Sequence, residues 1–199
     1  MTSPSDDSDG AALDKAALRK IVGRRRDELA AATPDIAELF KRRFLDTWTP
    51  PAGTVISAFW PIRSELDTRP LIHALHDRGC VIALPVVMGR LTALQFRQWG
   101  PDTRLDVGHF GVSTPPADAT VLEPDWLLVP LLAFDTCGYR LGYGGGFYDI
   151  TLAGLRARKK VFAVGAAYDG QEVPAVPRDA NDARLDAILT EQRVLIMEP

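Results

Sequence analysis

The feature that most constrains this chain of 199 residues is a glycine-rich stretch, Gly-Tyr-Gly-Gly-Gly at residues 142–146. An apolar run at residues 126–132 comes shortly before it and is typical of a buried strand. The segment after it ends in a basic run at residues 156–160, and cations are favoured at the C-terminus of a helix. The stretch is therefore predicted to connect a strand to a helix. Its exposed backbone N–H groups and the positive end of the helix dipole suit a bound phosphate.

The standard phosphate-binding motifs do not match this stretch. A Walker A loop ends in Gly-Lys-Ser/Thr, whereas Phe147 and Tyr148 follow the last glycine. A dinucleotide fingerprint requires a third glycine where Phe147 stands. When the glycines are taken alone, a tight turn with close helix–sheet packing explains them equally well. The flanking residues favour a binding loop, because Arg140 precedes the glycines and two aromatic residues and Asp149 follow them.

The rest of the chain alternates between strand-like and helix-like patterns. Strands are expected at residues 54–60, 81–85, 91–98, 126–132, 161–166 and 187–194, and helices at 11–32, 34–48, 66–78 and 147–158. The strand–helix–strand order at 54–85 predicts a parallel unit, to which 91–98 adds in antiparallel orientation, and 100–125 is expected to be loop-like. We therefore predict an α/β fold, a three-layer open and mostly parallel sheet with helices on both faces. A single domain is expected at 11–199, after a disordered tail at 1–10.

Composition excludes several classes of function. The formal net charge of −3 favours neither nucleic acid nor an anionic membrane surface as a partner. No apolar run approaches the roughly 20 residues that a membrane-spanning helix needs. The acidic, polar N-terminus is not that of a signal peptide, and Cys80 and Cys137 lack metal-ligand spacing and fit a reducing compartment. We expect a cytoplasmic protein that binds neither membrane nor nucleic acid.

The glycine-rich stretch resembles the signature of a known family. Residues 134–149, with Arg140-Leu-Gly-Tyr-Gly-Gly-Gly-Phe-Tyr-Asp149 at their end, are similar to the signature of the 5-formyltetrahydrofolate cyclo-ligases, also called 5,10-methenyltetrahydrofolate synthetases. Three further segments match in the same order, and they are Lys15–Arg19, Glu65–Thr68 and Asn181–Glu191. The resemblance spans about residues 13–193. It implies an enzyme that converts 5-formyltetrahydrofolate to 5,10-methenyltetrahydrofolate with ATP and Mg²⁺, by phosphorylation of the formyl oxygen and release of ADP and phosphate.

The resemblance also implies a role for individual residues. It assigns catalysis to Arg140, folate contacts to Trp60 and Glu65, and Mg²⁺ ligation to Asp149 and Asp182. It assigns ATP binding to Lys15, Arg19, Arg140, Leu141, Gly142, Tyr143, Gly144, Gly145, Gly146, Phe147 and Tyr148. The implied partners are a folate substrate and a nucleotide, and we expect a monomer. Because Arg140 stands at the start of a loop, we expect it outside the core, with little part in folding.

Local chemistry leaves an alternative open for several of these residues. Lys15 and Arg19 are neighbours on one side of a predicted helix, but they also fit an ordinary solvated basic face. Glu65 suits the N-terminus of a helix, where an acid balances the dipole, and Trp60 suits a core.

The two proposed metal ligands have alternatives as well. Asp149 is also explained as a helix cap and Asp182 as a turn residue. Asp186 competes with Asp182 for the second metal position, and spacing alone does not decide between them. The histidines show no zinc-binding pattern.

Departures from the family pattern leave two other functions open. Some members carry basic residues where Tyr143 and Gly145 stand here, Ile150 replaces a frequent arginine, and Thr114 replaces a frequent acid. One alternative is a non-catalytic member that binds a folate or a nucleotide. The other is a nucleic-acid binder that uses the basic helix at 15–26, which the overall acidity of the chain disfavours.

Overall fold

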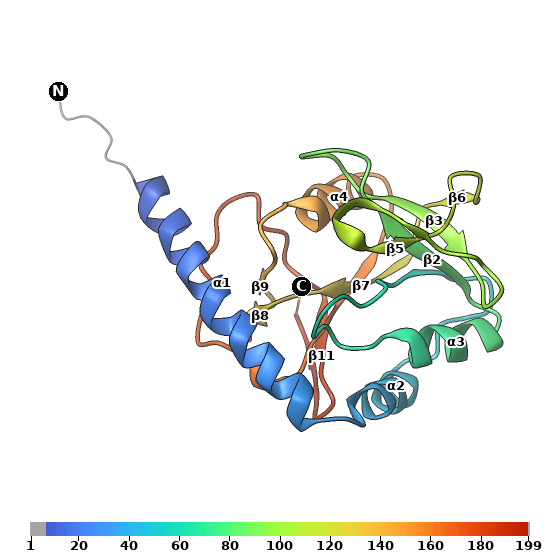
Figure 1. Cartoon of the computed structure of the whole chain (residues 1–199), viewed down its shortest axis with the longest axis horizontal. Coiled ribbons are helices and arrows are strands. Elements are labelled where there is room, and N and C mark those ends of the chain that lie inside the picture. The colour runs from blue at the N-terminus through green and yellow to red at the C-terminus, as the bar shows by residue number, and fades with distance from the viewer. Residues whose placement is uncertain (1–6, 199) are drawn as a thin grey trace.

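The computed structural model describes the backbone of residues 7–198 and the side chains from Lys15 onward (Figure 1). Its centre is an eight-stranded sheet with the order β12-β11-β10-β7-β1-β2-β3-β6. The strands are β1 (Val55–Ser57), β2 (Val81–Val86), β3 (Gln95–Trp99), β6 (Val121–Leu122), β7 (Trp126–Pro130), β10 (Phe162–Ala166), β11 (Ala187–Leu189) and β12 (Val194–Ile196). The central strands from β11 to β2 run parallel, whereas β12, β3 and β6 pair antiparallel at the two edges.

Helices cover both faces of this sheet. On one face lie α2 (Ile36–Thr47) and α3 (Arg69–Asp77), and on the other lies α4 (Phe147–Arg156), as Figure 1 shows. Successive residues of β7 serve the two layers in turn, since Leu128 packs with α2 and α3 whereas Leu127 and Val129 pack with α4. The predicted three-layer, mostly parallel α/β fold is confirmed.

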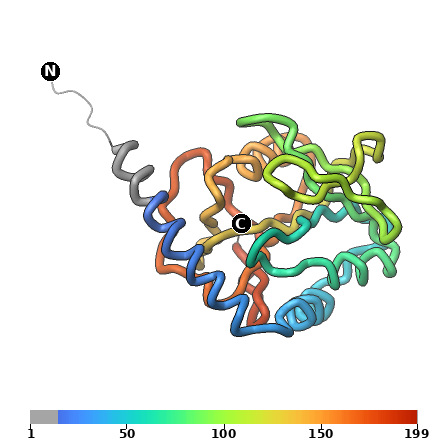
Figure 2. Tube along the Cα trace, viewed as in Figure 1, coloured from blue at the N-terminus to red at the C-terminus, as the bar shows by residue number. Residues whose placement is uncertain are grey.

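The middle of the long helix α1 (Asp7–Ala32) packs on a small two-stranded sheet, and Leu29 and Ala30 near its end pack against the core of the main sheet. The small sheet pairs β8 (Ala133–Phe134) with β9 (Arg140–Leu141), and the glycine stretch follows β9 directly. Val22 of α1 contacts this sheet in a small apolar cluster with Leu132 and Leu141. Figures 1 and 2 show α1 running along this side of the molecule. The helix therefore brings its charged side chains beside the glycine stretch.

The strand order places a switch point, where open α/β sheets have their ligand crevice, at the carboxyl ends of β1 and β7. From β1 the chain moves to β2 on one side, and from β7 it moves to β10 and β11 on the other. Open α/β sheets bind ligands at such a switch point, because the loops that follow the two strands diverge there. The loop after β1 carries Trp60 and Glu65, and the segment after β7 leads to the glycine stretch. The fold thus brings the segments singled out in the sequence to one edge of the sheet.

The expected last strand is a hairpin of two strands. The sequence predicts one strand at 187–194, whereas β11 and β12 pair antiparallel across a turn at 190–193. The hydroxyl of Thr190 accepts hydrogen bonds from the backbone N–H groups of Gln192 and Arg193, which stabilises the reversal. The four polar residues at 190–193 separate two apolar triplets, so the sequence carries a signal for this turn that the prediction of a single strand overlooks.

Two further expectations differ in detail. Helix α1 begins at Asp7 rather than at Ala11, consistent with the preference of acidic residues for a helix N-terminus, so residues 7–10 belong to the helix. The disordered tail stays a prediction for residues 1–6, which lie outside the described residues. The segment expected to be loop-like also contains short elements, namely β4 (Asp106–Val107), η1 (His109–Gly111), β5 (Ser113–Thr114) and β6.

Gly165 of β10 provides a test of how tightly the sheet and its cover are packed. A Cβ at this position would lie 2.7 Å from the side chain of Ile188 and 2.8 Å from that of Leu185. Gly165→Ala should therefore lower the free energy of unfolding by about 1–3 kcal/mol, because the core must shift to admit a methyl group. Urea denaturation followed by circular dichroism measures this change.

Gly154 in α4 is the matched control. A Cβ there meets only the Arg158 side chain at 3.7 Å, an ordinary contact. Gly154→Ala should stabilise the protein by about 0.5–1 kcal/mol through helix propensity. Equal effects of the two substitutions would contradict the described packing.

Candidate functional site

The glycine stretch forms an open loop between β9 and α4. Gly144 has φ +96° and Gly146, the residue that caps α4, has φ +67°, so both occupy the left-handed region that favours glycine. Among the described residues, no acceptor takes a hydrogen bond from the backbone N–H groups of residues 144–146. Free N–H groups at the start of a helix of ten residues form a concave, partly positive surface. The loop has the chemistry of an anion site.

Arg19 of α1 lies directly against this loop. Its Nε donates a hydrogen bond to the carbonyl oxygen of Gly142 at 2.9 Å. A Cβ on Gly144 would lie 3.2 Å from the central carbon of the guanidinium, so only glycine leaves room for this approach. A cation is thereby fixed beside the free N–H groups.

Lys15, one turn earlier on α1, lies beside the loop that precedes β11. Its Nζ forms ion pairs with Asp182 at 2.7 Å and Asp179 at 3.0 Å. Figure 2 shows this loop, in orange-red, passing beside α1. Burial lowers the pKa of Lys15, but the hydrogen bonds and charges of the two aspartates outweigh burial and raise it above its ordinary value. Lys15 is thus a cation that an ion pair holds beside Asp182, one of the two proposed metal ligands.

Arg140 forms a buried ion pair with Asp149. Its Nη2 lies 2.8 Å from Asp149 Oδ1, its Nη1 donates to the carbonyl oxygen of Ala183 at 2.8 Å, and its side chain is only 4% exposed. The expectation that Arg140 lies outside the core is therefore wrong. A loop start that faces a helix N-terminus encloses its side chain, and the partner acid comes from the first turn of that helix.

The two proposed metal ligands lie on either side of one backbone amide. Asp149 Oδ1 accepts a hydrogen bond from the N–H of Ala183 at 3.0 Å, and Asp182 is the residue just before it. Within the described chain, the protein donors reach only Oδ1 of Asp149 and Oδ2 of Asp182. Each carboxylate keeps one oxygen without a protein donor. Asp186 is engaged elsewhere, with Arg156 at 2.8 Å and the N–H of Ala163 at 2.7 Å.

Glu65 is linked to the glycine loop through a tyrosine. Tyr143 donates its hydroxyl proton to Glu65 Oε1 at 2.8 Å, and the N–H of Ile62 donates to Oε2 at 2.9 Å. Burial raises the pKa of Glu65, and these hydrogen bonds and the charges of Arg26 and Arg63 oppose that rise without cancelling it. The Glu65 carboxylate therefore faces the glycine loop and is held there by hydrogen bonds to both of its oxygens.

Two aromatic residues of the predicted site differ in their surroundings. The ring of Trp60 packs 6.0 Å from that of Trp99, with the guanidinium of Arg69 5.7 Å from its centre, so it is partly a core residue. The hydroxyl of Tyr148 is buried and has no hydrogen-bond partner among the described residues. Burial and the charge of Glu65 raise the pKa of Tyr148, so the phenol stays protonated. An unpartnered buried donor beside Glu65 is a feature that a bound ligand would satisfy.

Similar proteins of known family identify the family of this chain. The model of the 5-formyltetrahydrofolate cyclo-ligase family matches residues 12–191. The 5-formyltetrahydrofolate cyclo-ligase of Escherichia coli K12 is 36% identical over 144 residues, which is 70% of this chain and 79% of that protein. That of Mycolicibacterium smegmatis is 33% identical over 153 residues, or 73% and 77%. The chain belongs to the 5-formyltetrahydrofolate cyclo-ligase family.

Solved structures place the cyclo-ligase fold over nearly the whole chain. The NMR structure of 5,10-methenyltetrahydrofolate synthetase from Aquifex aeolicus aligns with a TM-score of 0.73 and 30% identity, and covers 93% of both chains. The synthetase from Mycoplasma pneumoniae aligns with a TM-score of 0.70 at 24% identity, which supports the fold alone. The resemblance drawn from the glycine stretch is confirmed. The roles of single residues stay predictions.

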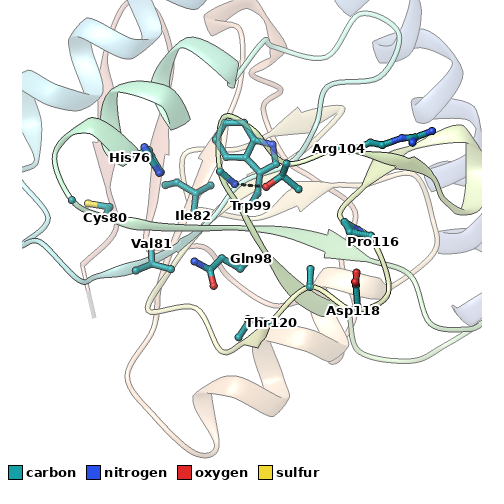
Figure 3. Close-up of a pocket in the computed structure, with 14 residues that line it drawn as sticks. His76, Cys80, Val81, Ile82, Gln98, Trp99, Arg104, Pro116, Asp118 and Thr120 are labelled. Atoms are coloured by element: carbon teal, nitrogen blue, oxygen red, sulfur yellow. Dashed lines mark hydrogen bonds between the residues drawn. The ribbon is translucent and has the colours of Figure 1, made fainter.

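A pocket lies away from the glycine loop. It has a volume of about 700 Å³ and lies at the amino end of β2, where His76, Trp99 and Arg104 line it (Figure 3). None of the predicted site residues belongs to its lining. The glycine loop, by contrast, lies at the carboxyl ends of the parallel strands.

No helix in the described part of the chain has the length and apolar character to cross a membrane.

Arg26 is a buried residue beside the candidate site that the sequence analysis did not single out. It is only 3% exposed and donates hydrogen bonds to Ser64 at 3.0 Å and to the hydroxyl of Tyr143. The signal was present in its spacing, because residues seven apart in a helix lie on one face and Arg19 is seven residues earlier. The several arginines around it hid that signal.

Loss of the Arg140–Asp149 ion pair should destabilise the folded protein. Arg140→Ala leaves Asp149 and the carbonyl of Ala183 without their buried donor, so the free energy of unfolding should fall by about 2–4 kcal/mol. Arg158→Ala is the control, since its pair with Glu123 is more than half exposed on both sides and should contribute below about 1 kcal/mol. Guanidinium denaturation compares the two variants. An Arg140→Ala protein as stable as the control would contradict a structural role for this pair.

Proposed function

We propose that this protein is an ATP- and Mg²⁺-dependent 5-formyltetrahydrofolate cyclo-ligase, which forms 5,10-methenyltetrahydrofolate, ADP and phosphate. Membership of the family supports the conversion itself. The observation that carries the nucleotide assignment is the glycine loop, whose free N–H groups at residues 144–146 lie beside the fixed cation of Arg19. Glu65, from the loop after β1, contacts the same glycine loop through the hydroxyl of Tyr143.

The substrate's chemistry explains why a nucleotide is needed. The formyl group on N5 is an amide, and attack by N10 must expel its oxygen, which leaves poorly as hydroxide. Transfer of the γ-phosphoryl group of ATP to that oxygen releases ADP and creates a phosphate leaving group. Attack by N10 then closes the ring, and phosphate departs with the oxygen. Such a reaction requires positioning and charge neutralisation rather than a protein nucleophile.

The described residues suit that requirement. The loop N–H groups and Arg19 would hold the polyphosphate, and Lys15 lies one helical turn away. Arg140 is assigned to catalysis by family resemblance, and its ion pair with Asp149 fixes the guanidinium at the base of the loop. Its two terminal nitrogens are occupied by protein acceptors, so its contribution is a charge that is already in place before substrate binds.

The site also fits Mg²⁺. This ion is commonly held by one or two carboxylates together with substrate phosphates. Asp149 and Asp182 lie at the edge of the glycine loop, and each keeps an oxygen without a protein donor among the described residues. These two residues would hold the ion, which would neutralise phosphate charge. Lys15 already pairs with Asp182, so it would share that carboxylate or move to the phosphates.

Glu65 and Trp60 suit the folate. A carboxylate with lone pairs left accepts hydrogen bonds from the amino and ring N–H groups of a pterin. Trp60 offers an aromatic face that is only partly covered by Trp99 and Arg69. The monomeric state and the cytoplasmic location stay predictions.

The alternatives differ from this function in what they predict. A non-catalytic member would bind folate or nucleotide without turnover. A nucleic-acid binder would use the basic side of α1, but Lys15, Arg19 and Arg26 are all engaged with protein groups. That engagement favours the small-molecule site.

Turnover tests the function directly. With ATP, Mg²⁺ and 5-formyltetrahydrofolate, we expect the absorbance of methenyltetrahydrofolate to rise and phosphate to be released in equal amount. A non-hydrolysable ATP analogue should give no product. Binding of both substrates without turnover would favour the non-catalytic alternative, and equal product with the analogue would rule out phosphoryl transfer.

The metal assignment predicts a change in Mg²⁺ dependence. Asp149→Asn and Asp182→Asn should each raise the Mg²⁺ concentration for half-maximal activity, roughly tenfold for the loss of one charged ligand. Since the two residues share one ion, the double variant should show a non-additive effect. Asp186→Asn is the control, because that carboxylate pairs with Arg156. A shift for Asp186→Asn and none for Asp182→Asn would reverse the assignment.

A further inference from the structure

Arg26 is a buried cation without a carboxylate partner. Only 3% of the residue is exposed, and no acid forms an ion pair with it among the described residues. Its recorded partners are the hydroxyl of Ser64, the hydroxyl of Tyr143 and the Tyr143 ring, whose centre lies 5.5 Å from its guanidinium carbon. A buried charge is costly unless it is compensated. Both hydroxyls lead on to an acid, because Ser64 donates to Asp27 and Tyr143 donates to Glu65, and the second of these acids is a proposed site residue.

Tyr143 transmits that compensation to Glu65. An arginine donates hydrogen bonds and never accepts them, so the Tyr143 oxygen must accept from Arg26. The hydroxyl proton is then free to point at Glu65 Oε1, 2.8 Å away. The pKa of Tyr143 is raised to about 12, chiefly by burial, so the phenol keeps this proton at physiological pH. The two hydrogen bonds therefore run in one direction, from Arg26 to Tyr143 and from Tyr143 to Glu65.

Glu65 is made an acceptor by this arrangement. Oε1 accepts from Tyr143 and Oε2 accepts from the N–H of Ile62, so both oxygens face donors. Each oxygen has a further lone pair, and those lone pairs can only accept from a ligand. The site at Glu65 thus selects a ligand that presents N–H or amino donors and disfavours one that presents acceptors.

We propose that Arg26 and Tyr143 are positioning residues for folate binding, which hold Glu65 as an ionised, donor-selective acceptor in the crevice. This inference rests on the proposed function and adds two residues to it. Arg26 reaches the crevice from α1 and Tyr143 from the glycine loop, so three separate segments meet at one carboxylate.

The pH dependence of folate binding follows from the groups around Glu65. They are Arg26 on α1, Tyr143 on the glycine loop, Tyr148 on α4 and Arg63 on its own loop. Protonated Glu65 loses an acceptor, so folate binding should weaken as the pH falls through its pKa. Burial raises that pKa and the Arg26 charge lowers it. Removal of Arg26 should therefore raise the pKa further and move the weakening to higher pH.

Calorimetric titration with 5-formyltetrahydrofolate, without nucleotide, tests this from pH 5.5 to 8.5. For Arg26→Met we expect the dissociation constant to rise about tenfold at pH 6 and less than threefold at pH 8. Arg26→Lys keeps the charge and should restore most of the wild-type pH profile. Arg24→Met is the matched control, since Arg24 is an exposed arginine on the same helix, and it should leave binding unchanged.

Tyr143→Phe is the second variant, in case Arg26→Met does not fold. Its side chain is partly exposed and the aromatic ring is kept, so the variant should fold, with a lower melting temperature because Arg26 loses one hydrogen-bond acceptor. Its folate dissociation constant should rise about three- to tenfold, and the double variant with Arg26→Met should be non-additive.

The possible failures are distinguishable. If wild-type protein neither binds the folate nor turns it over, the proposed function is overturned. If wild-type protein binds the folate but Tyr143→Phe binds it equally well with an unchanged pH profile, only the positioning role of Arg26 and Tyr143 is overturned.

Discussion

The buried ion pair between Arg140 and Asp149 is the interaction on which the rest of the site depends. It joins β9, where the glycine loop begins, to the first turn of α4, where the loop ends. The same carboxylate accepts the N–H of Ala183, and the same guanidinium donates to its carbonyl oxygen. One pair therefore sets the span of the loop and fixes the neighbouring segment that carries Asp182. The loop between these fixed ends has glycine where the backbone needs a positive φ, so its N–H groups remain free without strain.

Helix α1 supplies the complementary charge. Its apolar contact through Val22 anchors it on the β8–β9 sheet, and this places three of its cations toward the site, whereas Lys20, Arg24 and Arg25 are exposed to solvent. Lys15 meets Asp182, Arg19 meets the glycine loop, and Arg26 reaches Glu65 through Tyr143. Lys15 and Arg140 are paired with aspartates, whereas Arg19 bonds to a carbonyl oxygen, so its positive charge stays available beside the loop where phosphate is expected. These charges are held by protein contacts before any substrate arrives, so little reorganisation accompanies binding.

Sequence reasoning predicted the layers of the fold and the glycine loop, because these depend on local patterns. The apolar run of β7 and the left-handed glycines are visible without any partner. The hairpin turn at Thr190 was missed although the polar residues 190–193 interrupt the apolar pattern there, because the apolar residues on both sides were taken as one strand. Arg140 and Arg26 were misjudged or missed for another reason. Whether a charged residue is buried depends on which distant segment covers it. The partners of Arg140 lie on α4 and at Ala183, and Arg26 contacts Tyr143 of the glycine loop.

The central claim is that the free N–H groups of the glycine loop hold the nucleotide phosphates. Nuclear magnetic resonance of ¹⁵N-labelled protein reports these amides individually. On addition of a non-hydrolysable ATP analogue with Mg²⁺, we expect the largest shift changes at Gly144, Gly145 and Gly146, with little change around Trp99 in the pocket at the opposite end of the sheet. Unchanged glycine amides together with large shifts around Trp99 would show that the nucleotide does not bind at the glycine loop.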